Sequence, residues 1–134
     1  MKKPVWIRDD VVAVIHRRLI AEHGGAKGIR DEGLLSSALA RPKNLFAYPK
    51  ADLAALAAAY AFGIVRNHPF VDGNKRTGLV VCRTFLLLNG KDLDATREEK
   101  YLTFMKLARG ELAEDDLAEW IRERLVRLRR PPRT

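Results

Sequence analysis

The chain has 134 residues, 47% of them hydrophobic, and a formal net charge of +8. This length suffices for one domain with its own core, so folding requires neither a metal nor a disulfide, and the single cysteine, Cys82, excludes an intramolecular disulfide. The longest charge-free run, 53–65, is shorter than the roughly 20 apolar residues of a membrane span. Because no signal-like segment opens the sequence, we expect a cytoplasmic protein with no membrane partner.

Two amphipathic helices are predicted in the first third of the chain. Asp9 or Asp10 can cap a helix that runs to about Glu22, where a glycine-rich stretch stops it. A second, short helix is expected over 31–41, because the residue before a proline, here Pro42, avoids helical backbone.

The middle of the chain predicts a loop followed by two apolar helices. The loop covers 43–50 and contains exposed-looking aromatic residues. An alanine-rich helix should span 53–66, and a second apolar helix should span 77–89 and end at Gly90. The polar stretch between these two helices is treated below.

Two more helices are predicted towards the end of the chain. Thr96 and Glu99 form a capping box for a helix that runs to about Leu107. Gly110 then breaks the chain. A last helix is expected over 113–128, because its leucines and isoleucine recur at helical spacing.

Helical patterns therefore dominate the sequence. The only strand-like stretch is PVWI at 4–7, and no repeat or linker divides the chain. We predict an all-α fold: a compact single-domain bundle of about six helices over 1–134, with an arginine-rich tail from about residue 129.

The positive charge is concentrated partly in the stretch RERLVRLRRPPRT at 122–134. Such a surface could be a solvated helix face, or it could attract a nucleic acid, a ribosome-associated partner or an acidic protein. No basic groove interleaved with aromatic residues and no known DNA-reading motif accompanies the charge. We therefore do not expect direct nucleic-acid binding.

The stretch RNHPFVDGNKRTG at 66–78 places polar chemistry between two apolar helices. A helix N-terminus carries unpaired backbone N–H groups and the positive end of the helix dipole. Gly73 allows an anion to approach the backbone, and Lys75 and Arg76 add charged donors. The stretch lacks the spacing of a Walker A loop, so it indicates a phosphate site of another kind.

Two further residues of this stretch suit phosphate chemistry. Asp72 can bind Mg²⁺, which proteins hold through one or two carboxylates together with phosphate oxygens. His68 can accept a proton from an attacking hydroxyl at neutral pH, since an ordinary imidazole titrates near 6.5.

Each of these residues also has a structural explanation. Asn74 could cap the helix, Asp72 could interact with its dipole, Lys75 and Arg76 could form a solvated turn, and His68 could be a buried imidazole with its hydrogen bonds satisfied. Together, within nine residues and between charge-poor helices, they favour a functional site.

Four residues outside this group give weaker functional signals: Arg66, His16, His23 and Cys82. Arg66 either adds charge to the site or points into solvent. His16 and His23 lack the spacing of metal ligands, so we expect no functional role for them. Cys82 is expected to be a buried small hydrophobic residue.

The segment HPFVDGNKR at 68–76 resembles the signature of the Fic/Doc superfamily: His, any residue, Phe, any residue, Asp or Glu, Gly or Ala, Asn, Gly or Lys, and Arg. Every position matches. The similarity to the death-on-curing (Doc) branch extends over LIAEHGGAKGIRDEGLLSSALARPKNLFAY at 19–48 and through AAAYAFGIVRNHPFVDGNKRTG at 57–78 to FLLLNG at 85–90.

The resemblance implies a role for each motif residue. His68 becomes the general base that activates a target hydroxyl, and Asp72 becomes the carboxylate that binds Mg²⁺. The anion cradle for the phosphates is formed by Gly73, Asn74, Lys75 and Arg76. In the family a loop before the central helix is a flap that aligns the target; the matching stretch is 44–50, with the flap residues Asn44, Leu45, Phe46, Ala47 and Tyr48.

The resemblance also implies a reaction. Fic adenylyltransferases have glycine where this chain has Lys75. In Doc toxins a lysine at this position accompanies a nucleotide that is bound in the reversed orientation. The γ-phosphate of ATP is then transferred, and the enzyme is a protein kinase. Doc-type toxins act on a threonine of elongation factor Tu and block translation. The expected cofactors are thus Mg²⁺ and ATP, and the expected substrate is elongation factor Tu.

The expected partner follows from an absent motif. Many Fic proteins carry an inhibitory helix with Ser or Thr, three residues, Glu, then Gly or Asn, and this sequence has none. In the Doc branch a Phd-like antitoxin supplies the inhibition, and a basic toxin suits an acidic, disordered partner. Two alternatives stay open: a Fic-type nucleotidyltransferase that AMPylates a protein, and a non-catalytic module that binds nucleotide or nucleic acid.

Overall fold

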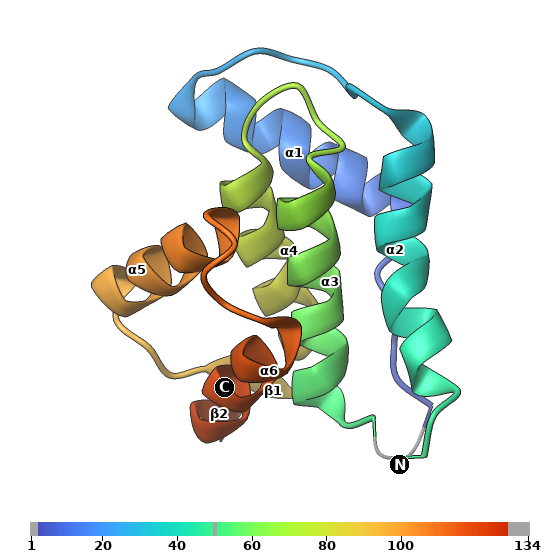
Figure 1. Ribbon diagram of the computed structural model, residues 1–134, viewed down its shortest axis with the longest axis vertical. Helices are drawn as coiled ribbons and strands as arrows, with labels where there is room; N and C mark the ends of the chain where they lie inside the picture. Colours follow the sequence, from blue (N-terminus) through green and yellow to red (C-terminus); the bar gives the residue numbers. More distant parts are fainter. Residues whose placement is uncertain (1–2, 50, 129–134) are drawn as a thin grey trace, which may run out of the picture.

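The computed structural model describes residues 3–49 and 51–128. Within them the chain forms six helices and one small sheet (Figure 1), so the predicted all-α, single-domain class is confirmed. The elements are α1 (Asp9–His23), α2 (Glu32–Phe46), α3 (Leu53–Asn67), α4 (Asn74–Leu88), β1 (Lys91–Leu93), α5 (Arg97–Ala108), α6 (Glu114–Glu123) and β2 (Leu125–Arg127).

Helices α3 and α4 form the centre of the molecule. The alanines of α3 are almost all fully buried, which allows α2, α4 and α6 to pack closely around it. The closest approach is at Gly78 of α4, where an added Cβ would lie 2.6 Å from a methyl carbon of Val65. Small residues at these positions therefore set the spacing of the central helix pair.

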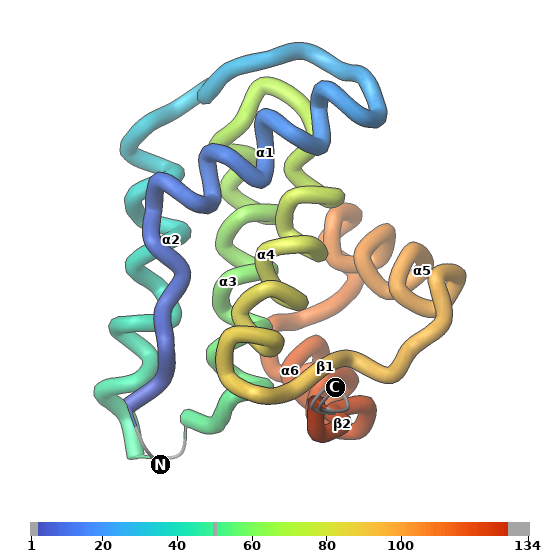
Figure 2. The backbone as a smooth tube through the Cα atoms, turned by 180° about the vertical axis from the view of Figure 1, so that it is seen from behind, coloured from blue at the N-terminus to red at the C-terminus, as the bar shows by residue number. Residues whose placement is uncertain are grey.

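The turn between α3 and α4 lies at one end of this pair. Helix α1 crosses the same end, as the tube view from behind shows (Figure 2), and the segment between α1 and α2 arches over it (Figure 1). Segments that are distant in sequence therefore border the polar stretch. His16 and Ala26 contact Asp72 from 56 and 46 positions earlier in the chain.

Helix α1 begins one residue earlier than a capping role for Asp9 requires. Its N-cap is Arg8, and Asp9 and Asp10 are its first two residues, where their charges interact favourably with the positive end of the helix dipole. By contrast, Asp31 caps α2 as expected and accepts a hydrogen bond from the N–H of Leu34 at 2.9 Å.

Helix α2 was wrongly predicted to end before Pro42. It continues to Phe46 with Pro42 buried inside it, so the predicted loop over 43–50 begins in helix. Proline removes one helical hydrogen bond. Tertiary packing offsets this loss, since Leu45 and Phe46 pack against the core and the Phe46 ring meets the Trp6 ring edge-on at 5.8 Å.

The C-terminal helix is also shorter than predicted. Helix α6 ends at Glu123, and the next residues form β2, which pairs antiparallel with β1 so that Leu125 lies opposite Leu93. The leucines of this segment therefore follow a strand, which their helical spacing does not reveal. The strand-like stretch 4–7 forms no strand.

Two further expectations can be compared with the structure, and a third falls outside it. The arginine-rich tail from about residue 129 lies outside the described residues. Among the helices that are described, none is both long and apolar enough to cross a membrane. Cys82 is fully buried, as expected, and burial raises the pKa of its thiol to about 12.

Candidate active site

The site is built on the sharp turn that ends α3 and begins α4. His68 caps the C-terminus of α3 with a left-handed backbone, φ 50° and ψ 54°, which is uncommon for a residue other than glycine. Gly73 then precedes α4, also with positive φ. Two left-handed residues thus reverse the chain within six residues, and the exposed His68 side chain enters a groove of ≈ 980 Å³.

The first turn of α4 carries the backbone donors expected of an anion site. The first backbone hydrogen bond of this helix joins the N–H of Thr77 to the carbonyl of Gly73. Within the described residues, the preceding N–H groups of Asn74, Lys75 and Arg76 have no protein acceptor, and no side chain caps the helix. These donors lie at the positive end of the α4 dipole, where an anion is favoured.

The side chain of Asn74 shapes the turn instead of facing the anion site. It is buried, its Oδ1 accepts from the N–H of Phe70 at 3.0 Å, and its Nδ2 donates to the carbonyl of Phe70 at 3.0 Å. The ring of Phe70 is itself 1% exposed. Asn74 therefore holds the loop in place at Phe70, whose ring is buried.

The same amide also orients the ring of His68. Asn74 Nδ2 lies 3.4 Å from His68 Nδ1, so an N–H group faces this ring nitrogen. A donor at this position favours the neutral tautomer that carries its proton on Nε2. At 3.4 Å the contact is long for a hydrogen bond, so Nδ1 can exchange it for a better donor.

Asp72 lies at the edge of the groove and its carboxylate is held by backbone donors. The N–H of Gly73 donates to Oδ1 at 2.8 Å, and the N–H of Ala26 donates to Oδ2 at 3.1 Å. Each oxygen keeps further acceptor capacity. Among the described residues there is no cluster of three metal-ligating side chains. A single carboxylate next to an anion site fits Mg²⁺, which takes its other ligands from phosphates and water.

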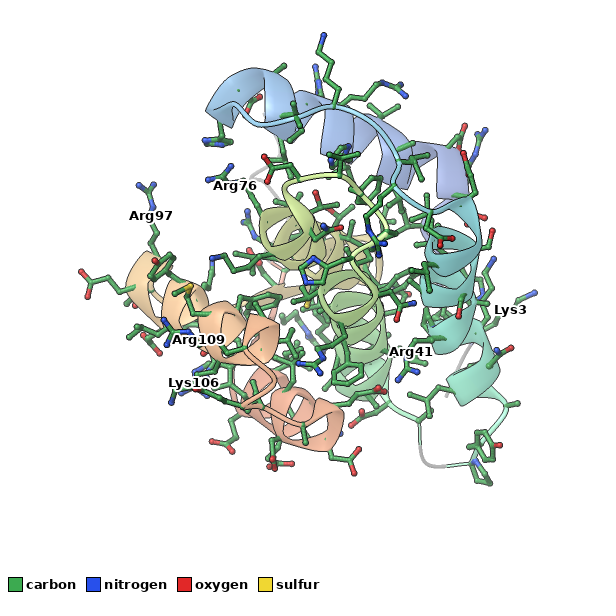
Figure 3. The ribbon with its side chains drawn as sticks, turned by 45° about the horizontal axis from the view of Figure 1, so that its top comes forward. Lys3, Arg41, Arg76, Arg97, Lys106 and Arg109 are labelled. Carbon is green, nitrogen blue, oxygen red and sulfur yellow. The ribbon has the colours of Figure 1, made fainter. Side chains whose placement is uncertain are left out.

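The two cations of the motif point in different directions. The ammonium of Lys75 lies 3.0 Å from the sulfur of Met105 and 5.4 Å from the ring centroid of Tyr101, so it is turned towards α5. Arg76 is exposed on the side of the molecule from which Arg97 also projects (Figure 3). Within the part of the chain that the structure describes, Arg76 makes no ion pair.

Helix α5 supplies the second wall of the groove. Arg97, Lys100 and Tyr101 line it opposite the motif, and Leu79 and Phe104 contribute apolar surface between the helices. Sequence reasoning missed this wall, because nothing in the capping box or the helical spacing of α5 indicates which helix it faces.

The loop before α2 is the segment that borders the motif. Ile29 forms an isolated antiparallel bridge with Phe70, and the N–H of Val71 donates to the carbonyl of Gly28 at 3.0 Å. The side chain of Arg30 donates to the carbonyls of His68 and Asn67 at 2.7 and 2.9 Å. Arg30 therefore supports the left-handed backbone at His68 and binds the carbonyl end of α3.

The predicted flap does not reach the motif. Asn44, Leu45 and Phe46 form the last turn of α2, and Ala47 and Tyr48 follow at the far end of α3 from His68 (Figure 1). Fifteen helical residues separate the two ends, about 20 Å along the axis. The flap prediction at 44–48 does not fit this placement, because the stretch adjoins the start of α3 at Leu53 whereas His68 follows its end.

Two other basic residues, His16 and Arg66, contact elements of the site without lining the groove. His16, for which no role was expected, is 3% exposed and its Nε2 lies 2.8 Å from the main-chain oxygen of Asp72. Arg66 lies outside the groove lining and reaches the carbonyl of Leu107 at the end of α5, at 3.5 Å. It thus contacts the wall of the groove from behind and adds no donor to the anion site.

Comparison with known proteins identifies the family of the chain. The model of the Fic/DOC family matches residues 6–86, which include α1 to α3, the whole motif loop and most of α4. Over 76 residues the chain is 46% identical to Toxin Doc of Mycolicibacterium smegmatis. That similarity covers 54% of this chain and 57% of the length of the relative, so the chain spans less than two thirds of it. Because the family match extends over more than half of its residues, the chain belongs to the Fic/DOC family.

Proposed function

We propose that the protein is a Doc-type toxin kinase, which transfers the γ-phosphate of ATP to a threonine hydroxyl of elongation factor Tu and so blocks translation. The observation that carries the proposal is that His68, Asp72 and the open N-terminus of α4 line one groove. The name of the relative, Toxin Doc, supports the toxin part of the proposal.

In the proposed reaction, the oxygen of the target hydroxyl forms a bond to the γ-phosphorus while the bond from that phosphorus to the bridging oxygen of ADP breaks. His68 takes the hydroxyl proton on Nδ1, after the incoming hydroxyl has replaced the long contact with Asn74. The backbone N–H groups at the start of α4 and the Arg76 guanidinium stabilise the charge on the phosphate oxygens.

Mg²⁺, held by Asp72, would neutralise part of the phosphate charge when it is bound. The backbone donors on Asp72 Oδ1 and Oδ2 keep this carboxylate pointed along the groove edge. Asp72 therefore has one proposed task, and His68 and the cradle perform theirs independently of it.

The body of the nucleotide is proposed to lie along α5. The cradle is at one end of the groove, and the groove continues between α4 and α5 past Lys100 and Tyr101. A triphosphate anchored by its γ-phosphate would extend in this direction. Lys100 then meets the inner phosphates, and the half-exposed ring of Tyr101 offers a face on which the base can stack.

The loop over 24–31 is proposed to take the target-aligning role that the resemblance to the family placed at 44–50. It pairs with the motif loop through Ile29 and Phe70, next to His68. A target segment that runs beside this bridge places its hydroxyl near His68.

The proposed partner is an acidic, Phd-like antitoxin, and the proposed location is the cytoplasm. The groove combines apolar residues such as Leu79 and Leu87 with the cations Arg97 and Lys100. An antitoxin segment with carboxylates and leucines that folds upon binding complements both features, and it would exclude nucleotide from the same groove.

One observation favours a second candidate, adenylyl transfer. The Lys75 ammonium is turned towards Met105 and Tyr101 of α5. If the ammonium stays there when ATP binds, the outer phosphates could lie at the N-terminus of α4 in the ordinary Fic orientation. The α-phosphate would then be transferred.

Mass spectrometry of elongation factor Tu, after incubation with the protein, ATP and Mg²⁺, tests the proposal. We expect a gain of one phosphate that is absent with His68→Ala. A gain of one nucleoside monophosphate would replace the kinase by the adenylyltransferase. If elongation factor Tu is unmodified while ATP binds, the proposed target is wrong, and a γ-³²P search in lysate distinguishes another target from a non-catalytic binding module.

A further inference from the structure

The motif loop is supported from beneath by a residue of α1. His16 approaches from a helix 56 positions earlier in sequence, and its Nε2 lies 2.8 Å from the main-chain oxygen of Asp72. Its ring stacks on Phe70, with centroids 3.8 Å apart and planes 7° from parallel. Both contacts act on the same six-residue loop, at Phe70 and at Asp72.

The burial of His16 makes this arrangement specific. Only 3% of the residue is exposed, and a buried polar group is stable where its hydrogen bonds are made. A carbonyl oxygen can only accept, so Nε2 carries the proton and donates it. An apolar side chain could replace the stacking on Phe70, but it would leave the carbonyl of Asp72 without this donor.

The contact determines where the carboxylate of Asp72 points. The Asp72 carbonyl is fixed by His16, and Gly73, the next residue, has left-handed φ and lies against Ile20, one turn after His16 on α1. With the peptide between Asp72 and Gly73 held, the carboxylate meets the N–H groups of Gly73 and Ala26.

We propose that His16 is a positioning residue, which holds the backbone of Asp72 so that its carboxylate is presented to the metal ion. The inference rests on the proposed function only through the role of Asp72 as the metal ligand. His16 does not touch the groove, and it acts through the motif loop.

Three variants separate positioning from general stability. His16→Met keeps a long, adaptable apolar side chain but removes the donor. His16→Gln keeps an N–H donor at a similar distance from the backbone. Val12→Ala is the matched control, because Val12 lies one turn earlier on α1 in the hydrophobic core and its truncation lowers stability without removing a polar contact.

Two readouts are needed besides activity. The first is hydrogen exchange of the Gly73 and Ala26 amides, which donate to Asp72, relative to the core amide of Ile64. The second is the concentration of Mn²⁺, used as a paramagnetic substitute for Mg²⁺, that half-broadens the Gly73 amide signal in NMR spectra. Melting temperatures report global stability.

We expect His16→Met to speed exchange at Gly73 and Ala26 about tenfold more than at Ile64, the size of effect that one lost hydrogen bond gives. The Mn²⁺ concentration for half-broadening should rise several-fold. His16→Gln should restore both readouts most of the way. Val12→Ala should lower the melting temperature without a selective effect at Gly73.

Equal behaviour of His16→Met and Val12→Ala at Gly73 and Ala26 would overturn the inference, because His16 would then only stabilise the core. So would a failure of His16→Gln to differ from His16→Met. If Mn²⁺ does not broaden Gly73 in the wild type, Asp72 is not a metal ligand and the proposed function loses that part; the exchange data then still decide whether His16 positions the loop.

Discussion

The two ends of α3 use polar residues in opposite ways. At the C-terminal end, His16, Arg30 and Asn74 bind backbone groups of the turn, and the side chain of His68 stays exposed in the groove. At the N-terminal end, charged side chains pair with one another. Asp52 binds Arg122 at 2.7 Å, and Arg122 also pairs with Glu119 at 2.7 Å.

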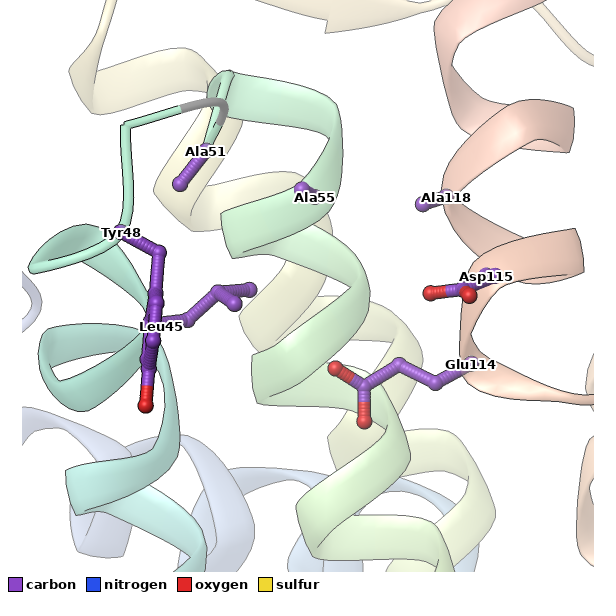
Figure 4. Close-up of a pocket in the computed structure, with 7 residues that line it drawn as sticks. All are labelled: Leu45, Tyr48, Ala51, Ala55, Glu114, Asp115 and Ala118. Atoms are coloured by element: carbon purple, nitrogen blue, oxygen red, sulfur yellow. The ribbon is translucent and has the colours of Figure 1, made fainter.

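Both ends are also hollowed, yet the cavities differ. The N-terminal end has a small pocket of ≈ 190 Å³, which Leu45, Ala55 and Ala118 line together with Glu114 and Asp115 (Figure 4). Its carboxylates would repel a phosphate. Charged residues alone therefore do not mark a candidate active site. What marks it is an arrangement in which the supporting side chains bind the backbone and leave the functional groups without an ion-pair partner among the described residues.

The largest expected effects come from truncating one side chain at each end of α3. His68→Ala should reduce phosphate transfer by about 100- to 10,000-fold, the usual contribution of a general base, with little change in melting temperature because the residue is exposed. Asp52→Ala should lower the melting temperature and leave the rate of phosphate transfer nearly unchanged. Transfer rates with γ-labelled ATP and circular dichroism melts measure both. Loss of activity in both variants with equal loss of stability would erase the distinction between the two ends.

A second test concerns the reach of the active end along α5. Tyr101→Leu should weaken ATP binding about 5- to 100-fold if the base stacks on the ring, as is typical of aromatic stacking. Tyr101→Phe should retain the affinity. Calorimetry with ATP and with tripolyphosphate checks this. If Tyr101→Leu weakens the binding of tripolyphosphate as much as that of ATP, Tyr101 does not act by stacking on the base. It then acts by holding the Lys75 ammonium, which lies 5.4 Å from its ring centroid.

The smallest expected effect is at the structural end and depends on pH. The hydrogen bonds from Arg122 hold the pKa of Asp52 below its ordinary value of 3.8, against the opposing effect of burial. A lowered folded-state pKa gives stability that is present above the unfolded pKa and is lost as pH falls through the folded pKa.

Asp52→Asn keeps the capping oxygen but removes the charge, so its cost at about pH 7 should be about 0.5 kcal/mol, the usual size for a half-exposed ion pair. The difference from wild type should vanish at a pH below the folded-state pKa of Asp52, where protonation removes the charge. Urea unfolding at both values measures it. A difference that persists in acid would mean that Asp52 acts through packing.

The parts of the site that are local in sequence could be predicted. His68, Asp72 and the start of α4 lie within nine residues, so a single turn brings them together. The capping box of α5 was predicted for the same reason, and Thr96 and Glu99 make both of its hydrogen bonds.

Features that depend on tertiary packing could not be predicted. The helical spacing of His16 says that it shares a face with Ile20, but not that this face meets the motif loop. Pro42 gave a local signal that favoured ending α2, and the packing of Leu45 and Phe46 outweighed it. The flap prediction came instead from the resemblance to the family, and its residues adjoin the start of α3, at the opposite end from His68.

The single cysteine gives the protein a built-in reporter. Cys82 lies on α4 between the two ends compared above, fully buried and with its thiol pKa raised to about 12, so alkylating reagents meet neither an accessible sulfur nor a thiolate in the folded chain. The rate at which it is labelled therefore measures how often the core opens. The same inertness means that a cysteine introduced at the groove can carry a fluorescent label without a competing reaction.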